Sequence, residues 1–215
     1  MLDELVQAII ASDPGGAENH TRAALAAGIA PRRIISEGLI AGMDVVGRRF
    51  RDGEMFVPQV LMSARAMHRA LNPVKPLLRA GETVSAGKVI IGTVKGDLHD
   101  IGKNLVAMLL EGVGFEVVNL GVDISPETFV AAARREGAEL VAMSALLTTT
   151  MLQMRQVVRA LEEAGLRQRV RVIVGGAPVT TEFANEIGAD GYGLDAAEAV
   201  ELSRSLVAAN RIDVR

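Results

Sequence analysis

The spacing of apolar residues changes near residue 78, and this change constrains the fold more than any other feature of the chain. Before it, apolar side chains recur at three- and four-residue intervals, as in Leu2, Leu5 and Ile9, which is the pattern of one buried helical face. Beyond residue 88, short apolar runs alternate with segments of helix length. The two patterns require different architectures, so we expect an all-helical part followed by an α/β part.

Proline and capping residues divide the first part into four helices. Asp13-Pro14 is typical of a helix start, Pro31 opens the third helix, and the fourth begins near Pro58. The third helix is expected to end at the sequence Arg-Asp-Gly-Glu that starts at Arg51. Four helices joined by short turns predict a four-helix bundle over residues 1–78.

The remainder of the chain predicts a short linker and an α/β domain. Residues 79–87 are rich in small and polar types, and residues 88–215 follow them. Five segments are predicted strands: 89–94, 116–120, 140–144, 170–174 and the neighbourhood of Gly191. Strands that alternate with helices form a parallel sheet covered on both faces. Five strands favour a flavodoxin-like (Rossmann-like) sheet, in which ligands bind beyond the carboxyl ends of the strands.

Composition excludes several classes of protein. The 215 residues carry a net charge of −3 and only 3% aromatic residues, which argues against a nucleic-acid partner. The chain has no cysteine, which excludes disulfides, thiolate metal sites and a cysteine nucleophile. No apolar run reaches about 18 residues and the start of the chain lacks a signal-peptide pattern, so we expect a cytoplasmic protein without a membrane partner.

The loop after the first predicted strand holds a carboxylate and an imidazole two residues apart. His99 is the one histidine of the α/β part, and Asp97 precedes it in a loop bounded by Gly96 and Gly102. A carboxylate bound to imidazole fixes the tautomer and raises the basicity of the far nitrogen, as a metal-ligating histidine requires. Taken alone, the spacing is equally compatible with a loop histidine that is hydrogen-bonded to its neighbour.

The loops after the third and fourth predicted strands are also unusual. Four hydroxyl residues fall within Ser144–Thr150, whereas a helix cap accounts for only one or two of them. Gly175 and Gly176 permit close approach of a ligand to the backbone, although paired glycines alone indicate a plain turn just as well. All three loops are expected at the same edge of the sheet.

Together these loops resemble the cobalamin-binding signature shared by methionine synthase, the corrinoid proteins of methyltransferase systems and the cobalamin mutases. The signature is D-x-H-x-x-G at Asp97, then S-x-L at Ser144, then G-G at Gly175, in that order. The strings around it (92–104 and 172–179) and Gly-Met-Asp-Val-Val-Gly in the helical part are similar to those of methyl-carrying corrinoid proteins. The resemblance covers nearly the whole chain and includes a helical cap domain.

The resemblance implies a role for each residue of the first loop and its neighbours. His99 would be the lower axial ligand of cobalt, replacing the base of the cobamide itself (base-off/His-on). Asp97 would bind the imidazole, and Thr150 would extend this hydrogen-bonded relay. The other implied cofactor-binding residues are Gly96, Leu98, Asp100, Ile101 and Gly102 in the first loop, Ser144, Leu146, Thr148, Gly175 and Gly176 along the nucleotide tail, and Phe50 and Val57 over the upper corrin face.

The resemblance also implies a methyl carrier that binds cobalamin or a related cobamide. A substrate-specific methyltransferase would place a methyl group on cobalt, and a second methyltransferase would pass it to tetrahydrofolate or to a thiol such as coenzyme M. The chain alone is not expected to turn over substrate. The methyl donor stays open among methylamines, methanol, glycine betaine and aryl methyl ethers, and so does the oligomeric state.

Two other functions remain open at this point. One is a cobalamin-dependent sensor or regulator without methyl transfer. The other is a hydrolase that uses Asp97, His99 and Ser144 as a triad, although this serine lacks the G-x-S-x-G setting of α/β hydrolases.

Overall fold

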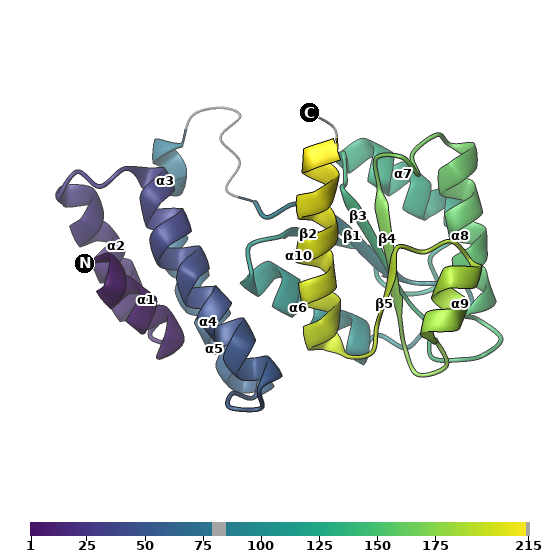
Figure 1. Cartoon of the computed structure of the whole chain (residues 1–215), viewed down its shortest axis with the longest axis horizontal. Coiled ribbons are helices and arrows are strands. Elements are labelled where there is room, and N and C mark those ends of the chain that lie inside the picture. Colours follow the sequence, from purple (N-terminus) through teal and green to yellow (C-terminus); the bar gives the residue numbers. More distant parts are fainter. Residues whose placement is uncertain (79–84, 214–215) are drawn as a thin grey trace. The chain divides into compact units, whose positions relative to one another are not determined.

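The computed structural model describes residues 1–78 and 85–213, and these fall into two compact units (Figure 1). The first unit is Met1–Ser85 with Glu111–Gly114, and the second is Ala86–Leu110 with Phe115–Arg215. Of the predicted linker, residues 79–84 lie outside the described residues. Within the described ranges, no helix has both the length and the apolar character needed to cross a membrane.

The first unit is helical, as predicted. Its elements are α1 (Leu2–Ile10), α2 (Pro14–Ala26), α3 (Pro31–Arg33), the π-helix η1 (Ile34–Ile40), α4 (Ala41–Arg51), α5 (Val57–Leu71) and the 3₁₀ turn η2 (Lys75–Leu77). The side chain of Asp13 accepts hydrogen bonds from the first turn of α2, which explains why this helix starts at Pro14. α1 packs against α2 and α4, and α2 packs against α5.

The third predicted helix differs from a regular α-helix. The elements α3, η1 and α4 follow one another without a break, but the middle of this segment is a π-helix. Its buried residues are Ile34, Ile35, Gly38 and Leu39, so the pairs Ile34/Gly38 and Ile35/Leu39 keep the four-residue spacing of an α-helical face. A Cβ at Gly38 would lie 2.6 Å from a methyl carbon of Leu5, so the glycine lets α1 approach closely.

The second unit is a five-stranded parallel sheet with the order β2-β1-β3-β4-β5, which confirms the predicted flavodoxin-like topology. The strands are β1 (Lys88–Thr93), β2 (Glu116–Asn119), β3 (Leu140–Ser144), β4 (Arg171–Gly175) and β5 (Gly191–Gly193). The last residues of the three central strands are in register, because Thr93 pairs with Ser144 and Ser144 pairs with Gly175. The loops that follow these strands therefore begin side by side at the carboxyl edge.

Helices cover both faces of the sheet, as predicted for parallel strands. They are α6 (Ile101–Gly112), α7 (Pro126–Glu136), α8 (Leu152–Glu163), α9 (Thr181–Glu186) and α10 (Ala196–Asp213). Figure 1 shows α6 and α10 on one side of the strands and α7, α8 and α9 on the other.

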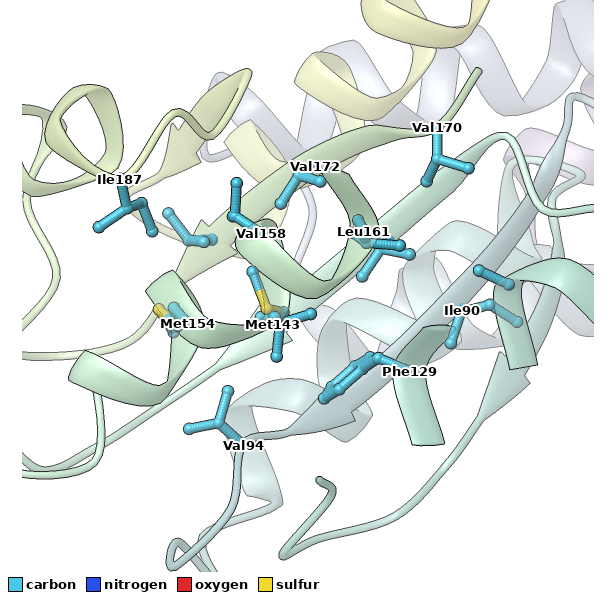
Figure 2. Close-up of a cluster of buried hydrophobic side chains, with 14 of the residues drawn as sticks. Ile90, Val94, Phe129, Met143, Met154, Val158, Leu161, Val170, Val172 and Ile187 are labelled. Atoms are coloured by element: carbon cyan, nitrogen blue, oxygen red, sulfur yellow. The ribbon is translucent and has the colours of Figure 1, made fainter. Parts of the chain in front are cut away.

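An aliphatic core holds β1 and β3 against α7 and α8 (Figure 2). Phe129 of α7 is fully buried, and a Cβ at Gly92 would lie 2.8 Å from its ring. Ile90 and Val94 join the same cluster, so that successive inward-facing positions of β1 are fixed by packing. The core thereby gives a rigid base to the loop that carries Asp97 and His99.

Candidate functional site

The loop between β1 and α6 joins the imidazole of His99 to the carboxylate of Asp97. His99 Nδ1 lies 2.7 Å from Asp97 Oδ1, and the backbone N–H of His99 donates to the same oxygen at 3.1 Å. Because an ionised carboxylate only accepts hydrogen bonds, the proton of the neutral imidazole is on Nδ1 and Nε2 keeps its lone pair. The imidazole is 53% exposed, and no described residue forms a hydrogen bond with Nε2. This nitrogen is available to an external ligand or metal.

The other oxygen of Asp97 is bound by the loop after β3. Asp97 Oδ2 accepts hydrogen bonds from the backbone N–H of Leu146 at 2.8 Å and from the hydroxyl of Thr150 at 2.6 Å. Burial of the Asp97 carboxyl acts to raise its pKa, but the hydrogen bonds from Thr150, Leu146 and His99 together hold that pKa well below its usual range. Asp97 is therefore an ionised carboxylate that is fully buried and fully hydrogen-bonded.

The lowered pKa of Asp97 makes the stability of the protein depend on pH. A group whose pKa is lowered by folding stabilises the protein above its unfolded-state pKa of about 3.9, and this stabilisation is lost as the pH falls toward the folded-state pKa. Between about pH 5 and about pH 3 the wild-type protein should lose about 1 kcal/mol more unfolding free energy than Asp97→Asn. Urea unfolding at both pH values measures this double difference. An equal loss in both proteins would contradict the assignment of Asp97 as an ionised, stabilising group.

A second anchor holds the backbone of His99. The hydroxyl of Thr93, the fully buried last residue of β1, donates a hydrogen bond to the carbonyl oxygen of His99 at 2.8 Å. The backbone N–H of Thr93 donates to the carbonyl oxygen of Gly121 in the loop after β2. The sequence analysis did not select Thr93, because it lies at the end of an apolar strand and outside the D-x-H-x-x-G spacing.

A cavity of about 210 Å³ lies beside this loop, on the side of the sheet that α6 and α10 cover. Four of the predicted residues contribute to its lining, namely Gly102, Ser144, Gly175 and Gly176. The sequence analysis missed the contribution of β5 and α10, which supply Gly193, Leu194, Asp195, Ala196 and Ala199. The sequence signal of β5 is weak because this strand has only three residues, so the sequence did not indicate a binding loop after it.

Two glycines of the cavity lining, Gly102 and Gly176, differ in the space that surrounds them. Gly176 has φ +124°, and a Cβ there would lie 1.9 Å from the carbonyl oxygen of Ala145. At Gly102, near the start of α6, a Cβ would meet nothing within 4 Å. The protein itself thus requires glycine at position 176, whereas at position 102 a side chain would only occupy open space.

Lys103, which also could not be found from the sequence pattern, lines the same cavity and is almost fully buried. Its ammonium group donates to the side-chain oxygens of Asn104 at 2.6 Å and Asn119 at 2.8 Å. Burial lowers the pKa of Lys103, and nearby Asp100 opposes this effect. The hydrogen bonds join the first turn of α6 to the end of β2.

Large apolar side chains are exposed in the loops at the carboxyl edge of the sheet. Leu98 is 72% exposed and Ile101 is 86% exposed, on either side of His99 in the sequence. Leu146 and Leu194, from the loops after β3 and β5, are also exposed. Exposed apolar side chains that gather beside a cavity are typical of a ligand-binding surface.

The remaining predicted residues have other surroundings. Gly96 has φ +82°, and its N–H donates a hydrogen bond to the carboxylate of Asp123. The carboxylate of Asp100 accepts a hydrogen bond from the side chain of Asn104. The side chain of Thr148 is exposed. In the helical unit, Phe50 lies on α4 and Val57 begins α5, and both are half-buried.

The site does not contain the hydrogen bond that a hydrolase triad needs. Within the described residues, no hydrogen bond joins the hydroxyl of Ser144 to His99, whose Nδ1 is bound to Asp97. Ser144 instead lines the cavity.

Comparisons with known proteins identify the family of both units. Residues 87–201 and residues 1–75 each match a family described as B12 binding domain. The chain is 46% identical over 186 residues to trimethylamine corrinoid protein 1 of Methanosarcina acetivorans, which covers 86% of each chain. It is 41% identical over 210 residues to a corrinoid protein of Desulfitobacterium hafniense, which covers 96% of this chain and 97% of the relative.

Solved structures agree with this result. A cobalamin-binding protein from Desulfitobacterium hafniense DCB-2 superimposes with a TM-score of 0.77 and 33% identity, over 96% of this chain and 98% of that chain. The methanol:cobalamin methyltransferase complex of Methanosarcina barkeri contains a chain that superimposes with a TM-score of 0.82 and 33% identity, over 96% of this chain and 79% of that chain.

The residues of the site fit a cobamide. Nε2 of His99 is a nitrogen donor without a partner among the described residues, and imidazole nitrogen is a ligand type that suits a transition metal. Leu98 and Ile101 offer apolar surface to a large ring, and the space beside Gly102 accepts ligand atoms that a side chain would displace. On the family matches and relatives together, this chain is a member of the B12-binding family of corrinoid proteins and binds cobalamin or a related cobamide.

Proposed function

We propose that this protein is a methyl carrier that binds its cobamide in the base-off/His-on form, with Nε2 of His99 as the lower axial ligand of cobalt. The single observation that carries the proposal is the state of this imidazole. Its Nδ1 is held by Asp97, while about half of the side chain is exposed to solvent and Nε2 has no partner among the described residues. A histidine in a corrinoid protein that is oriented in this way has the tautomer and the basicity of a metal ligand.

The bound cobamide supplies a cobalt centre that accepts and releases a methyl group. Asp97 orients the ring of His99 and keeps its proton on Nδ1, and it stays ionised because Leu146 and Thr150 also donate to it. If Nε2 left the metal and took up a proton, the carboxylate of Asp97 would stabilise the imidazolium, so proton uptake at Nε2 would be coupled to the change in coordination.

The displaced nucleotide tail is assigned to the cavity between the sheet, α6 and α10. Ser144, Gly102, Gly175 and Gly176 line this cavity, and the hydroxyl of Ser144 forms no hydrogen bond with any described residue. Leu146 and Thr148 belong to the loop that follows Ser144. We assign Phe50 and Val57 of the helical unit to the opposite face of the corrin, where apolar side chains would exclude water from the reacting centre.

The partners follow from the names of the relatives. Several relatives are called trimethylamine or dimethylamine corrinoid proteins, and one solved relative is part of a methanol:cobalamin methyltransferase complex. We infer that a methylated amine is the methyl donor. One substrate-specific methyltransferase would load the carrier, and a second methyltransferase would transfer the methyl group to its acceptor.

Depletion and add-back in an extract of the native cells test this function. The extract is depleted of this chain with an antibody and then supplied with cobamide-loaded wild-type protein or His99→Ala at equal occupancy. Wild type should restore transfer of ¹³C-methyl from trimethylamine, dimethylamine or methanol to a thiol or folate acceptor, and His99→Ala should restore less than about a tenth of it. Wild-type protein that binds one cobamide per chain but restores transfer from none of these donors would contradict the carrier role and favour a sensor.

A further inference from the structure

The loop between β2 and α7 contains a carboxylate that binds the backbone of the His99 loop. The N–H of Gly96 donates a hydrogen bond to Asp123 Oδ1 at 2.7 Å. In return, the N–H of Asp123 donates to the carbonyl oxygen of Asp97 at 3.0 Å. The two hydrogen bonds are reciprocal, and they hold the two consecutive residues Gly96 and Asp97 from one side.

Hydrogen bonds from other loops therefore hold both the side chain and the main chain of Asp97. Its side chain is bound by Leu146 and Thr150 from the loop after β3, while its main chain is bound by Asp123 from the loop after β2. The other main-chain tether of Asp97 is a turn in which its N–H donates to Val94. The position of the carboxylate that orients His99 therefore depends on loops from two different strands.

The backbone of Asp123 has an unusual conformation, which bears on why a carboxylate is present at this position. Asp123 has φ +57°, and only one other non-glycine residue of the described chain, Ser12, has a positive φ. Glycine adopts this conformation without steric cost, and aspartate and asparagine are among the few other residues that adopt it, at a small cost. The hydrogen bond that Gly96 donates to the carboxylate offsets this cost. Asp123 is exposed, so burial does not explain why a carboxylate is present there.

We propose that Asp123 is a positioning residue for the axial histidine. It acts through the backbone of Gly96 and Asp97 and contacts neither the imidazole nor, on the proposed function on which this inference rests, the metal. Its loss frees the loop after β1, so the carboxylate of Asp97 and the imidazole bound to it sample more orientations. The signature D-x-H-x-x-G does not include this residue, because it is 24 positions beyond His99 in the sequence.

Two variants of Asp123 separate the effect of losing its carboxylate from the effect of its positive φ. Asp123→Gly removes the acceptor but adopts the positive φ freely, whereas Asp123→Asn keeps a side-chain oxygen and tolerates the left-handed conformation. Ser12→Gly is a matched control, since Ser12 also has a positive φ of +58° and side-chain hydrogen bonds, to Gln59 and Ser63, but lies in the helical unit.

The first measurement uses the protein without cobamide, so that it does not depend on the proposed function. Amide hydrogen exchange of His99 and Leu146 reports on Asp97, because both N–H groups donate to its carboxylate. Asp123→Gly should reduce the protection of both amides by about tenfold, while Asp123→Asn and Ser12→Gly stay within about threefold of wild type. Unchanged protection in Asp123→Gly would overturn the inference.

The second measurement uses the cobamide-loaded protein in the cobalt(II) state. Electron paramagnetic resonance detects the nitrogen splitting from an axial histidine. Asp123→Gly should show a smaller fraction of histidine-ligated cobalt and a cobamide Kd about three- to tenfold higher, and Asp123→Asn should restore both. If wild type shows the histidine splitting and Asp123→Gly matches it in splitting and Kd, the positioning role is wrong. If wild type lacks the splitting, the proposed function fails, and the exchange measurement still decides whether Asp123 positions Asp97.

Discussion

Replacing Asp97 by alanine is expected to raise the Kd for cobamide by about 10- to 100-fold, the usual effect of losing the partner that orients a metal-bound histidine. The substitution removes the acceptor of His99 Nδ1, so the imidazole loses both its fixed orientation and the preference for a free Nε2. It also leaves the N–H of Leu146 without its acceptor, whereas the hydroxyl of Thr150 keeps the carbonyl oxygen of Leu147 as an acceptor at 3.0 Å. Titration of the purified protein with cobamide, followed by its visible spectrum, measures the change.

Variants of Thr150 test whether the hydrogen bonds to Asp97 affect the Kd for cobamide. Thr150→Val keeps the shape of the side chain but removes one of the hydrogen bonds to Asp97 Oδ2, so its Kd should rise by about tenfold or less. Thr150→Ser retains the hydroxyl and should bind cobamide nearly as wild type does. Equal affinity in wild type, Asp97→Ala and Thr150→Val would contradict the relay of hydrogen bonds.

Replacing Gly176 by alanine should cost about 3 kcal/mol or more of unfolding free energy, which places it among the most damaging single substitutions. The new Cβ would overlap the carbonyl oxygen of Ala145, and the residue would be strained at φ +124°. Because this carbonyl belongs to the backbone just after β3, the clash cannot be relieved by turning a side chain. Urea unfolding of the protein without cobamide measures the loss.

Gly102→Ala is the matched control, with the opposite expected result. Its Cβ meets no protein atom within 4 Å and lies in a helix, where alanine is favoured over glycine by up to about 1 kcal/mol. The variant without cobamide should therefore be as stable as wild type or slightly more stable. Because Gly102 lines the cavity, we expect its cobamide Kd to rise by about tenfold, which corresponds to about 1.4 kcal/mol. A destabilised Gly102→Ala would contradict the open space at this position, and a variant that binds cobamide as wild type does would show that the cofactor does not lie against Gly102.

The fold could be predicted almost completely because its elements are regular in sequence. The predicted strand 140–144 coincides with β3, and the predicted helix 126–136 coincides with α7, whose ends carry Ser125 as a cap and Gly137 in the left-handed conformation. The π-helical segment could not be predicted, because its buried residues (Ile34, Ile35, Gly38 and Leu39) have the four-residue spacing of an ordinary α-helix.

The candidate site could be predicted where its residues are close in sequence. The spacing of Asp97 and His99 suggested their hydrogen bond, and the hydroxyl-rich loop after β3 suggested a partner, which the structure shows to be Thr150. Asp123 and Lys103 could not be found in this way. Their contacts are made across neighbouring strands, and their side chains bind main-chain or amide groups that leave no residue pattern.

The central claim is that Nε2 of His99 binds cobalt in place of the base of the cobamide. Its most direct test is the electron paramagnetic resonance spectrum of the cobalt(II) protein, produced once with ¹⁴N-histidine and once with ¹⁵N-histidine and loaded with the same unlabelled cobamide. We predict that the superhyperfine pattern changes between the two samples and that His99→Ala shows no such label-dependent pattern. An identical pattern from both labelled samples would mean that no histidine nitrogen binds cobalt, and the claim would be wrong.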